Sequence, residues 1–169
     1  MLNELDCPKY SRDKLTTEVT KSFQDHLQNR LFYINNVNGL LIARKINLNP
    51  NKALLKELKD GTSFDFFINI KARKNKSDFS VVELYQNENT IGANQSEVIL
   101  EIYDLNLSEI IYSQQVIGSD SPKKESSVWA SKKSDKLIDN IAFYRTSNKL
   151  MLGSLKKILK DLKKKSITI

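Results

Sequence analysis

The segment from Ser96 to Ser119, SEVILEIYDLNLSEIIYSQQVIGS, constrains the fold more than any other part of the chain. Val98, Leu100 and Ile102 alternate with their neighbours at the period of a β-strand that has one face toward a core. The run from Ile110 to Ile117 is rich in β-branched and aromatic residues. The residues between these two runs include the Asp, Asn and Ser that turns favour. The segment therefore predicts a long β-hairpin.

Two carboxylates, Glu97 and Glu101, fall on the opposite face of the first strand from Val98 and Leu100. Such a pair suits a solvated outer face of a sheet, or else a general acid and base that work together. The solvated face is the ordinary explanation, so we predict that these two side chains meet water.

The chain length of 169 residues, with 40% hydrophobic and 28% charged residues, is typical of one domain with one core. No run approaches the roughly 18 apolar residues of a membrane span. The start, MLNELDCPKY, shows neither the basic nor the apolar region of a signal peptide. We expect either a cytosolic protein or one whose export signal has been removed. The predicted organisation is an extension at 1–10, a single domain at 11–165 and a tail at 166–169.

The other elements follow from periodicity and from residues that begin or end helices. Leucines and other apolar residues at every fourth position predict a helix from Ser11 to Leu31, with Ser11 as its N-cap. Asn49-Pro50 and Asp60-Gly61 are typical of the start and end of a second helix. Further strands are predicted at 40–46, 64–72 and 79–85, the last two as a hairpin, and Phe67 indicates a second covered face. With the long hairpin, these make an α/β fold whose mixed β-sheet of about five strands is flanked by helices.

The C-terminal third is different in composition. Residues 118–133 are rich in Ser and Lys and predict a mobile loop. From about residue 135 to 165, apolar residues keep the helical period, which predicts a long C-terminal helical segment. This segment either runs through as one helix or breaks near Thr146-Ser147-Asn148.

The net charge of +7 is concentrated at the C-terminal end. Residues 1–120 carry 14 Lys and Arg against 16 Asp and Glu, whereas residues 121–169 carry 13 against 4. Leu155, Leu159 and Leu162 would pack on the sheet and leave a stripe of lysines outward. A solvated face and a contact for a polyanion or a protein partner both fit this stripe, and the near absence of Arg makes any nucleic-acid binding non-specific. The candidate contact residues are Lys156, Lys157, Lys160, Lys163, Lys164 and Lys165.

No catalytic or cofactor site is recognisable in the sequence. His26 is the sole histidine and Cys7 the sole cysteine, too few for a zinc site built from these residue types alone. No nucleophile motif accompanies His26, which we interpret as a helix-surface residue. The five glycines are scattered rather than gathered in a phosphate-binding loop. We therefore expect a protein that is not an enzyme and needs no cofactor or metal.

The order of predicted elements resembles that of bacterial envelope lipoproteins of the CsgG, LpoB and TolB-amino-terminal kind. The matching residues are Leu54 to Gly61 before Phe64 to Ile68, where such domains have a helix, a glycine and a strand with an aspartate between aromatic residues. Glu101 to Asp104 and Glu109 to Ser113 match the hairpin that follows. The chain departs from the pattern at the hairpin turn, where Ser108 replaces the usual glycine, and in lacking a lipid-attachment motif.

This resemblance implies a non-enzymatic binding or scaffold protein of the cell envelope, periplasmic or associated with the outer membrane. Such a protein acts through contacts with another envelope protein. The alternative is a cytosolic protein that binds nucleic acid non-specifically through its basic C-terminal segment. Fold alone does not decide between them.

Overall fold

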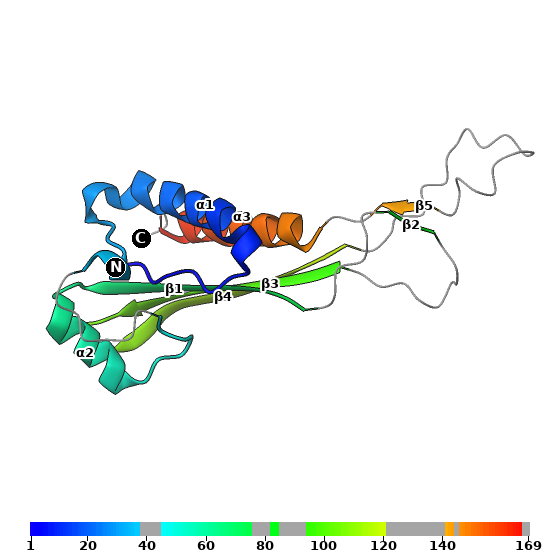
Figure 1. Cartoon of the computed structure of the whole chain (residues 1–169). Helices are drawn as coiled ribbons and strands as arrows, with labels where there is room; N and C mark the ends of the chain where they lie inside the picture. The colour runs from blue at the N-terminus through cyan, green and yellow to red at the C-terminus, as the bar shows by residue number, and fades with distance from the viewer. Residues whose placement is uncertain (38–44, 76–81, 85–93, 121–140, 144–145, 167–169) are drawn as a thin grey trace, which may run out of the picture.

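The computed structural model describes residues 1–37, 45–75, 82–84, 94–120, 141–143 and 146–166. The helices are α1 (Lys9–Leu27), α2 (Lys52–Thr62) and α3 (Ser147–Ser166), with two short 3-10 turns at Gln28–Arg30 and Ile34–Asn36. The strands are β1 (Phe66–Lys74), β2 (Val82–Leu84), β3 (Asn94–Asp104), β4 (Glu109–Asp120) and β5 (Ile141–Phe143). Helices α1 and α3 lie side by side on one face of the main sheet, and α2 lies beyond the other face (Figure 1).

The main sheet has three strands in the order β1-β3-β4, and both pairings are antiparallel. β2 pairs with β5 in a separate two-stranded sheet. The α/β class with flanking helices is confirmed, but a single mixed sheet of about five strands is not. The predicted hairpin of 64–72 with 79–85 is wrong for residues 82–84, because β1 pairs with β3 instead. The predicted strand at 40–46 lies mostly outside the described residues.

The long hairpin is confirmed. β3 and β4 pair from Asn94 opposite Asp120 to Asp104 opposite Glu109. The Oδ1 of Asp104 accepts hydrogen bonds from the backbone N–H groups of Asn106 (2.8 Å) and Leu107 (3.1 Å). Ser108 takes the left-handed φ of 52° that glycine usually supplies. The aspartate thus fixes a turn in which serine occupies the glycine position.

One core lies between the sheet and the pair α1 and α3. The predicted apolar stripe of the first helix is buried here, and Val98 and Leu100 of β3 meet it with no exposed surface. The main contributors from the helices are Leu15, Val19, Phe23, Met151, Leu155 and Ile158. Ser11 is not the N-cap, since α1 begins at Lys9 after Pro8. Its buried hydroxyl instead donates to Asn148 Oδ1 (2.7 Å) and joins α1 to the start of α3.

A second, smaller core lies under α2 on the opposite face of the sheet. Leu55 and Leu58 of α2 pack with Phe67, Tyr103 and Leu105. The second covered face that Phe67 indicated is therefore confirmed.

The predicted ends of α2 are each misplaced. Asn51, not Asn49, is the N-cap, and its Oδ1 accepts from the N–H of Leu54 (2.8 Å). At the other end, Gly61 lies inside the last turn, and Ser63 takes the left-handed conformation after the helix.

The N-terminal residues Met1 to Asp6 run parallel to β1 along its free edge. The N–H of Asn3 donates to the carbonyl of Ile68 (2.9 Å), and that of Ala72 donates to the carbonyl of Asp6 (2.8 Å). Leu2 and Leu5 of this segment are buried in the first core. Residues 1–10, expected as an extension before the domain, therefore include a segment that covers one edge of the sheet.

The helical segment expected from 135 to 165 is not one continuous helix. Residues 141–143 form β5, and α3 begins at Ser147, so the break near residues 146–148 is the alternative that the structure supports. Of the loop expected at 118–133, residues 118–120 extend β4, and the rest lies outside the described part of the chain.

The predicted solvated face of β3 is wrong. Glu97 and Glu101 are each only 3% exposed. The Oε2 of Glu101 accepts a hydrogen bond from the Tyr103 hydroxyl and another from the N–H of Asn49 (3.2 Å). Glu97 pairs with Arg73 of β1 and accepts a further hydrogen bond from Gln115 of β4. Both carboxylates are buried because neighbouring donors replace the water they lose.

Replacing Glu101 by Lys should destabilise the protein by about 3 kcal/mol, since it places an ammonium group against the Asn49 N–H and leaves the Tyr103 hydroxyl without its acceptor. Urea unfolding at neutral pH measures the change. The matched control is Glu57→Lys on the exposed side of α2, which should alter the free energy of unfolding by well under 1 kcal/mol. Equal effects of the two substitutions would contradict the burial of this face.

Asp6 should make the stability depend on pH. Its Oδ1 lies 2.6 Å from Lys45 Nζ and its Oδ2 lies 3.4 Å from Lys71 Nζ. The hydrogen bond from Lys45 is the main reason that the pKa of Asp6 is lowered from 3.8. A carboxyl group whose pKa is lower in the folded than in the unfolded protein stabilises the fold at pH values above its unfolded pKa. This stabilisation is lost as the pH falls through the folded pKa.

Asp6→Asn should therefore flatten the decrease in unfolding free energy between about pH 5 and pH 2, as measured by urea titrations at each pH. Lys45→Gln should flatten it similarly, and the double variant should add little to either. A slope unchanged in Asp6→Asn would show that this ion pair does not couple to folding.

Candidate functional site

The six lysines predicted as contact residues lie on one exposed side of α3. The helix carries them there because Leu155, Ile158 and Leu159 on its other side are buried against the sheet. Leu162 is half-buried and packs against the same core, as expected. The resulting lysine face consists of Lys156, Lys157, Lys160, Lys163, Lys164 and Lys165.

Lys156 and Lys165, at the two ends of the lysine face, each contact a neighbouring element. Lys156 Nζ lies 3.4 Å from Glu18 Oε2 of α1. Lys165 Nζ lies 5.2 Å from the centroid of the Tyr112 ring on β4. These contacts hold each end of the lysine face against a neighbouring element, so the face is attached to a rigid support rather than to a free tail.

A second surface, which the sequence analysis did not single out, is the open side of β4. Of the seven large hydrophobic side chains that are exposed among the described residues, four lie on β4 or in the turn before it. Ile111 is 53% exposed and Ile117 is 56% exposed. Both point away from the helix-covered face, on which Tyr112 and Val116 pack. Exposed apolar residues gathered in this way are typical of a contact surface.

The edge of β4 lacks two features that usually keep sheet edges apart, namely charged side chains and proline. From Ile110 to Ser119 the strand has no charged residue and no proline. Within the described residues, β4 is the last strand of its sheet, so its outer backbone groups face away from β3. We call this edge, together with Ile111 and Ile117, the β4 surface. The uncharged run was the sequence signal that could have identified it.

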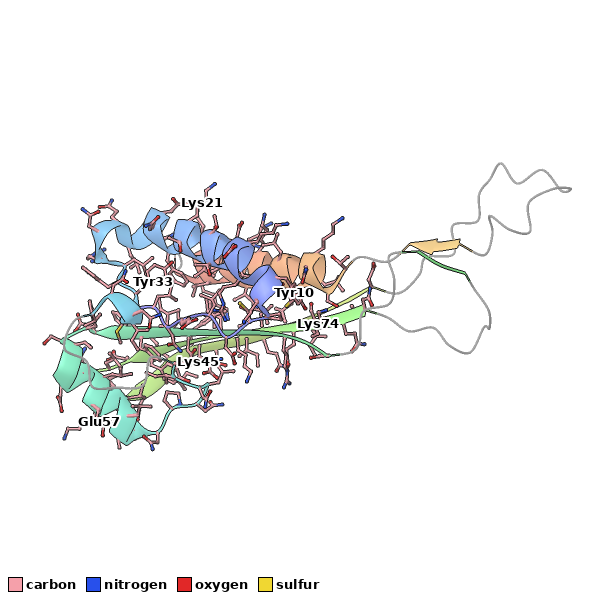
Figure 2. All side chains as sticks on the ribbon, in the orientation of Figure 1. Tyr10, Lys21, Tyr33, Lys45, Glu57 and Lys74 are labelled. Carbon is pink, nitrogen blue, oxygen red and sulfur yellow. The ribbon has the colours of Figure 1, made fainter. Side chains whose placement is uncertain are left out.

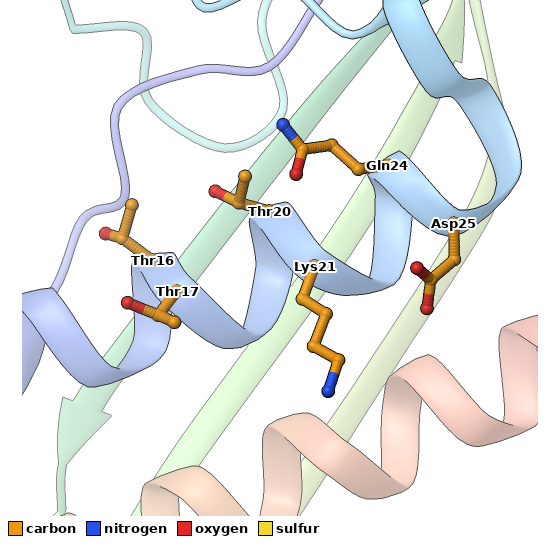
Figure 3. A pocket seen from close by; sticks show the side chains of 6 residues that line it. All are labelled: Thr16, Thr17, Thr20, Lys21, Gln24 and Asp25. Atoms are coloured by element: carbon orange, nitrogen blue, oxygen red, sulfur yellow. The ribbon is translucent and has the colours of Figure 1, made fainter.

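The surface of α1 has a shallow hollow of about 350 Å³ (Figure 3). Thr16, Thr17, Thr20, Lys21, Gln24 and Asp25 line it. An adjoining hollow of about 410 Å³ reaches the N-terminal segment at Glu4 and the ring of Tyr33. Both are open to solvent and lined mostly by polar or charged residue types, without the enclosed walls that small-molecule sites usually have.

The buried polar groups of the second sheet face hold the structure together. Asn69 donates to the carbonyl of Asn47 (2.9 Å), which ties the segment before α2 onto the sheet. Burial and the hydrogen bond to Glu101 raise the pKa of Tyr103. The Tyr103 hydroxyl therefore stays protonated and donates to the carboxylate. Each of these groups has a structural partner, so the cluster has the properties of a buried network rather than of an acid and base.

Two other side chains that the sequence analysis considered, Cys7 and His26, lie just before α1 and within α1. Burial is the main cause that raises the pKa of the half-buried Cys7 thiol, which makes it a poorer nucleophile. His26 lies on the exposed side of α1 as predicted, with its Nδ1 2.8 Å from the carbonyl of Ser22. Elsewhere on the surface, Lys74 Nζ lies 4.8 Å from the centroid of the exposed Tyr10 ring (Figure 2). In the described residues, no three His, Cys, Asp or Glu side chains gather as a metal site.

No family model and no curated protein matches this chain. Several solved structures are weakly similar, including the following three. The hypothetical protein CT253 from Chlamydia trachomatis has a TM-score of 0.45 at 9% identity, over 95% of this chain and 92% of that one. Lipoprotein GNA1162 from Neisseria meningitidis has a TM-score of 0.37 at 8% identity, over 99% and 96%. A putative lipoprotein from Caulobacter crescentus has a TM-score of 0.30 at 11% identity, over 69% and 84%.

Two of these three structures are described as bacterial lipoproteins. Their similarity to this chain is too slight to indicate a function, and none is described as a CsgG, LpoB or TolB protein. The resemblance to that kind of domain stays a prediction. No helix in the described part of the chain is long and apolar enough to cross a membrane.

Proposed function

We propose that this chain is a non-enzymatic binding or scaffold protein that acts through protein contacts, and that the β4 surface is its contact site. The observation that carries the proposal is the exposure of Ile111 and Ile117 on an uncharged edge strand. Exposed isoleucines that cost free energy in water are stabilised when a partner covers them. An open strand edge adds backbone hydrogen bonds to the same contact.

The β4 surface lies on a rigid part of the protein, as is expected for a scaffold. β4 pairs with β3 from Glu109 to Asp120 except at the bulged Ile111, and α3 packs against both strands. A contact surface on such a rigid support loses little conformational entropy when a partner binds. Placement in the bacterial envelope, against another envelope protein, follows from the sequence resemblance and is part of the proposal.

A photo-reactive amino acid at Ile117 should form a covalent adduct with another protein chain in the cells that make this protein. The matched control is the same amino acid at Glu57, which is exposed on α2, a helix that packs at the Tyr103 end of β3, whereas Ile117 lies beside Glu97 at the other end of that strand. Mass spectrometry of the adduct identifies the partner, and fractionation of the same cells shows whether the adduct lies in the envelope. Adducts of equal yield at both positions, or no adduct at Ile117, would overturn the β4 surface as the contact site.

The lysine face supports a second candidate, non-specific binding of nucleic acid in the cytosol. Three consecutive lysines, Lys163 to Lys165, are exposed at the end of α3. Such a cluster attracts a phosphate backbone but does not read bases. The β4 surface has no role in this alternative, because phosphates gain nothing from isoleucine.

The salt dependence of nucleic-acid binding distinguishes the scaffold from the nucleic-acid-binding protein. If the lysine face binds nucleic acid, affinity falls steeply with added salt, because each neutralised phosphate releases counterions. Replacing Lys163, Lys164 and Lys165 by Gln would then flatten the slope, whereas the same change at Lys9, Lys14 and Lys21 on α1 would not. For the scaffold we expect no measurable binding at roughly physiological ionic strength, where charges are screened over about 8 Å. Tight binding that the first triple change abolishes would favour the alternative.

A further inference from the structure

The open edge of β4 is complementary to itself. We propose that β4 pairs antiparallel with β4 of a second copy of this chain, with Gln114 opposite its own counterpart on a two-fold axis. This inference rests on the proposed function in one respect, that β4 is a protein-contact surface. It goes further by naming the occupant and the register.

Only certain registers are possible when a strand pairs with itself. Side chains directly opposite each other in an antiparallel pair point to the same face of the sheet. Ile111, Ser113, Gln115 and Ile117 share the open face of β4. One residue must therefore lie directly opposite its own counterpart across the two-fold axis. If the axis instead lay between two successive residues, each open-face side chain would be opposite a helix-face one.

In the register centred on Gln114, apolar side chains of one copy lie opposite apolar side chains of the other. It places Ile111 of each copy opposite Ile117 of the other, so two isoleucine pairs form and the most exposed apolar side chains of the strand are covered. On the helix-covered face it places Tyr112 opposite Val116. Aromatic and β-branched pairs of this kind stabilise antiparallel strands.

Moving the axis by one residue in either direction destroys this match. With Ser113 on the axis, Ile111 falls opposite Gln115 and Ile117 falls opposite the charged Glu109. With Gln115 on the axis, Ile111 falls opposite Ser119 and Ile117 falls opposite Ser113. Each neighbouring register thus leaves both Ile111 and Ile117 against a polar or charged residue.

Charge supports the same register. With Gln114 on the axis, Glu109 lies opposite Ser119 and Asp120 lies opposite Ser108, so no two carboxylates oppose each other across the new pairing. The ten residues between these acidic ends carry no charge at all. Strand edges that avoid pairing usually carry a lysine, a proline or an inward charge within such a run.

The geometry of the sheet leaves this edge available. Residues Met1 to Asp6 cover the β1 edge, whereas within the described residues no strand lies beyond β4. A β-bulge lies at one end of the proposed contact, because the register between β3 and β4 shifts at Ile102/Tyr103 and Ile111 has no partner of its own on β3. From Tyr112 to Asp120 the pairing with β3 is regular, so the edge is straight over most of the proposed contact.

Cysteine scanning tests the register. In a Cys7→Ser background, Gln114→Cys should form a disulfide-linked dimer under mild oxidation, since opposite Cβ atoms lie about 4.5–5.5 Å apart. Ser113→Cys and Gln115→Cys are the matched controls, because their own counterparts would lie diagonally at about 7–8 Å. They should crosslink only when the two variants are mixed. Crosslinking of either control alone in preference to Gln114→Cys would overturn the register.

Sedimentation of the unmodified chain tests the association itself. We expect a reversible dimer whose dissociation constant rises at least about tenfold in Ile111→Lys/Ile117→Lys. Leu107→Lys, an equally exposed residue in the turn outside the proposed pairing, should leave the dissociation constant unchanged. Circular dichroism shows whether the variants fold. A monomer at all concentrations up to about 1 mM would overturn the proposal.

The two proposals fail separately. A monomer in solution that still forms an Ile117 adduct with a different protein in cells would leave the β4 surface as a contact site and overturn self-pairing. The absence of any adduct, with a monomer in solution, would overturn both. A dimer with the expected crosslinks supports self-pairing whatever else the cells show.

Discussion

The rest of the structure depends on the enclosure of β3. β1 pairs along one edge of this strand and β4 along the other. Val98 and Leu100 are buried under the two helices, while Glu101 and Tyr103 are buried on the opposite face. A strand enclosed on all sides can keep a carboxylate only where fixed donors replace water. Glu101 therefore helps to fix the position of Asn49 and of the segment that leads into α2, together with the Tyr103 hydroxyl and the side chain of Asn69.

Local pattern was sufficient to predict the hairpin and the helix faces. The alternation of Val98, Leu100 and Ile102 indicates a strand with one buried face, whichever elements pack on that face. The stripe from Leu15 to Phe23 on α1 was predictable for the same reason. The basic side of α3 followed from where its leucines pack. Contacts within one element, or between elements adjacent in sequence, are those that periodicity encodes.

Pairing between distant segments could not be predicted in this way. The sequence shows which face of β3 is apolar, but not that α2 and Asn49 cover the other face. Glu101 was expected in water for that reason. The same limit applies to β4, whose open face has a composition that also suits a covered strand. Whether Ile111 and Ile117 are exposed depends on what the remainder of the chain packs against, and the structure shows that α3 takes the other side.

The N-terminal segment on β1 determines how far such a sheet can grow. Strand addition is repeated without limit when a sheet has two open edges, because every added copy presents a new edge to the next; fibres form in this way. Met1 to Asp6 take up the hydrogen-bonding groups of β1 from Phe66 to Ala72. Once β4 is paired, no open edge is left in the described sheet. If β4 pairs as we propose, this short segment on one side of the sheet makes the association at the other side a closed reaction, which ends at two copies and not in a polymer.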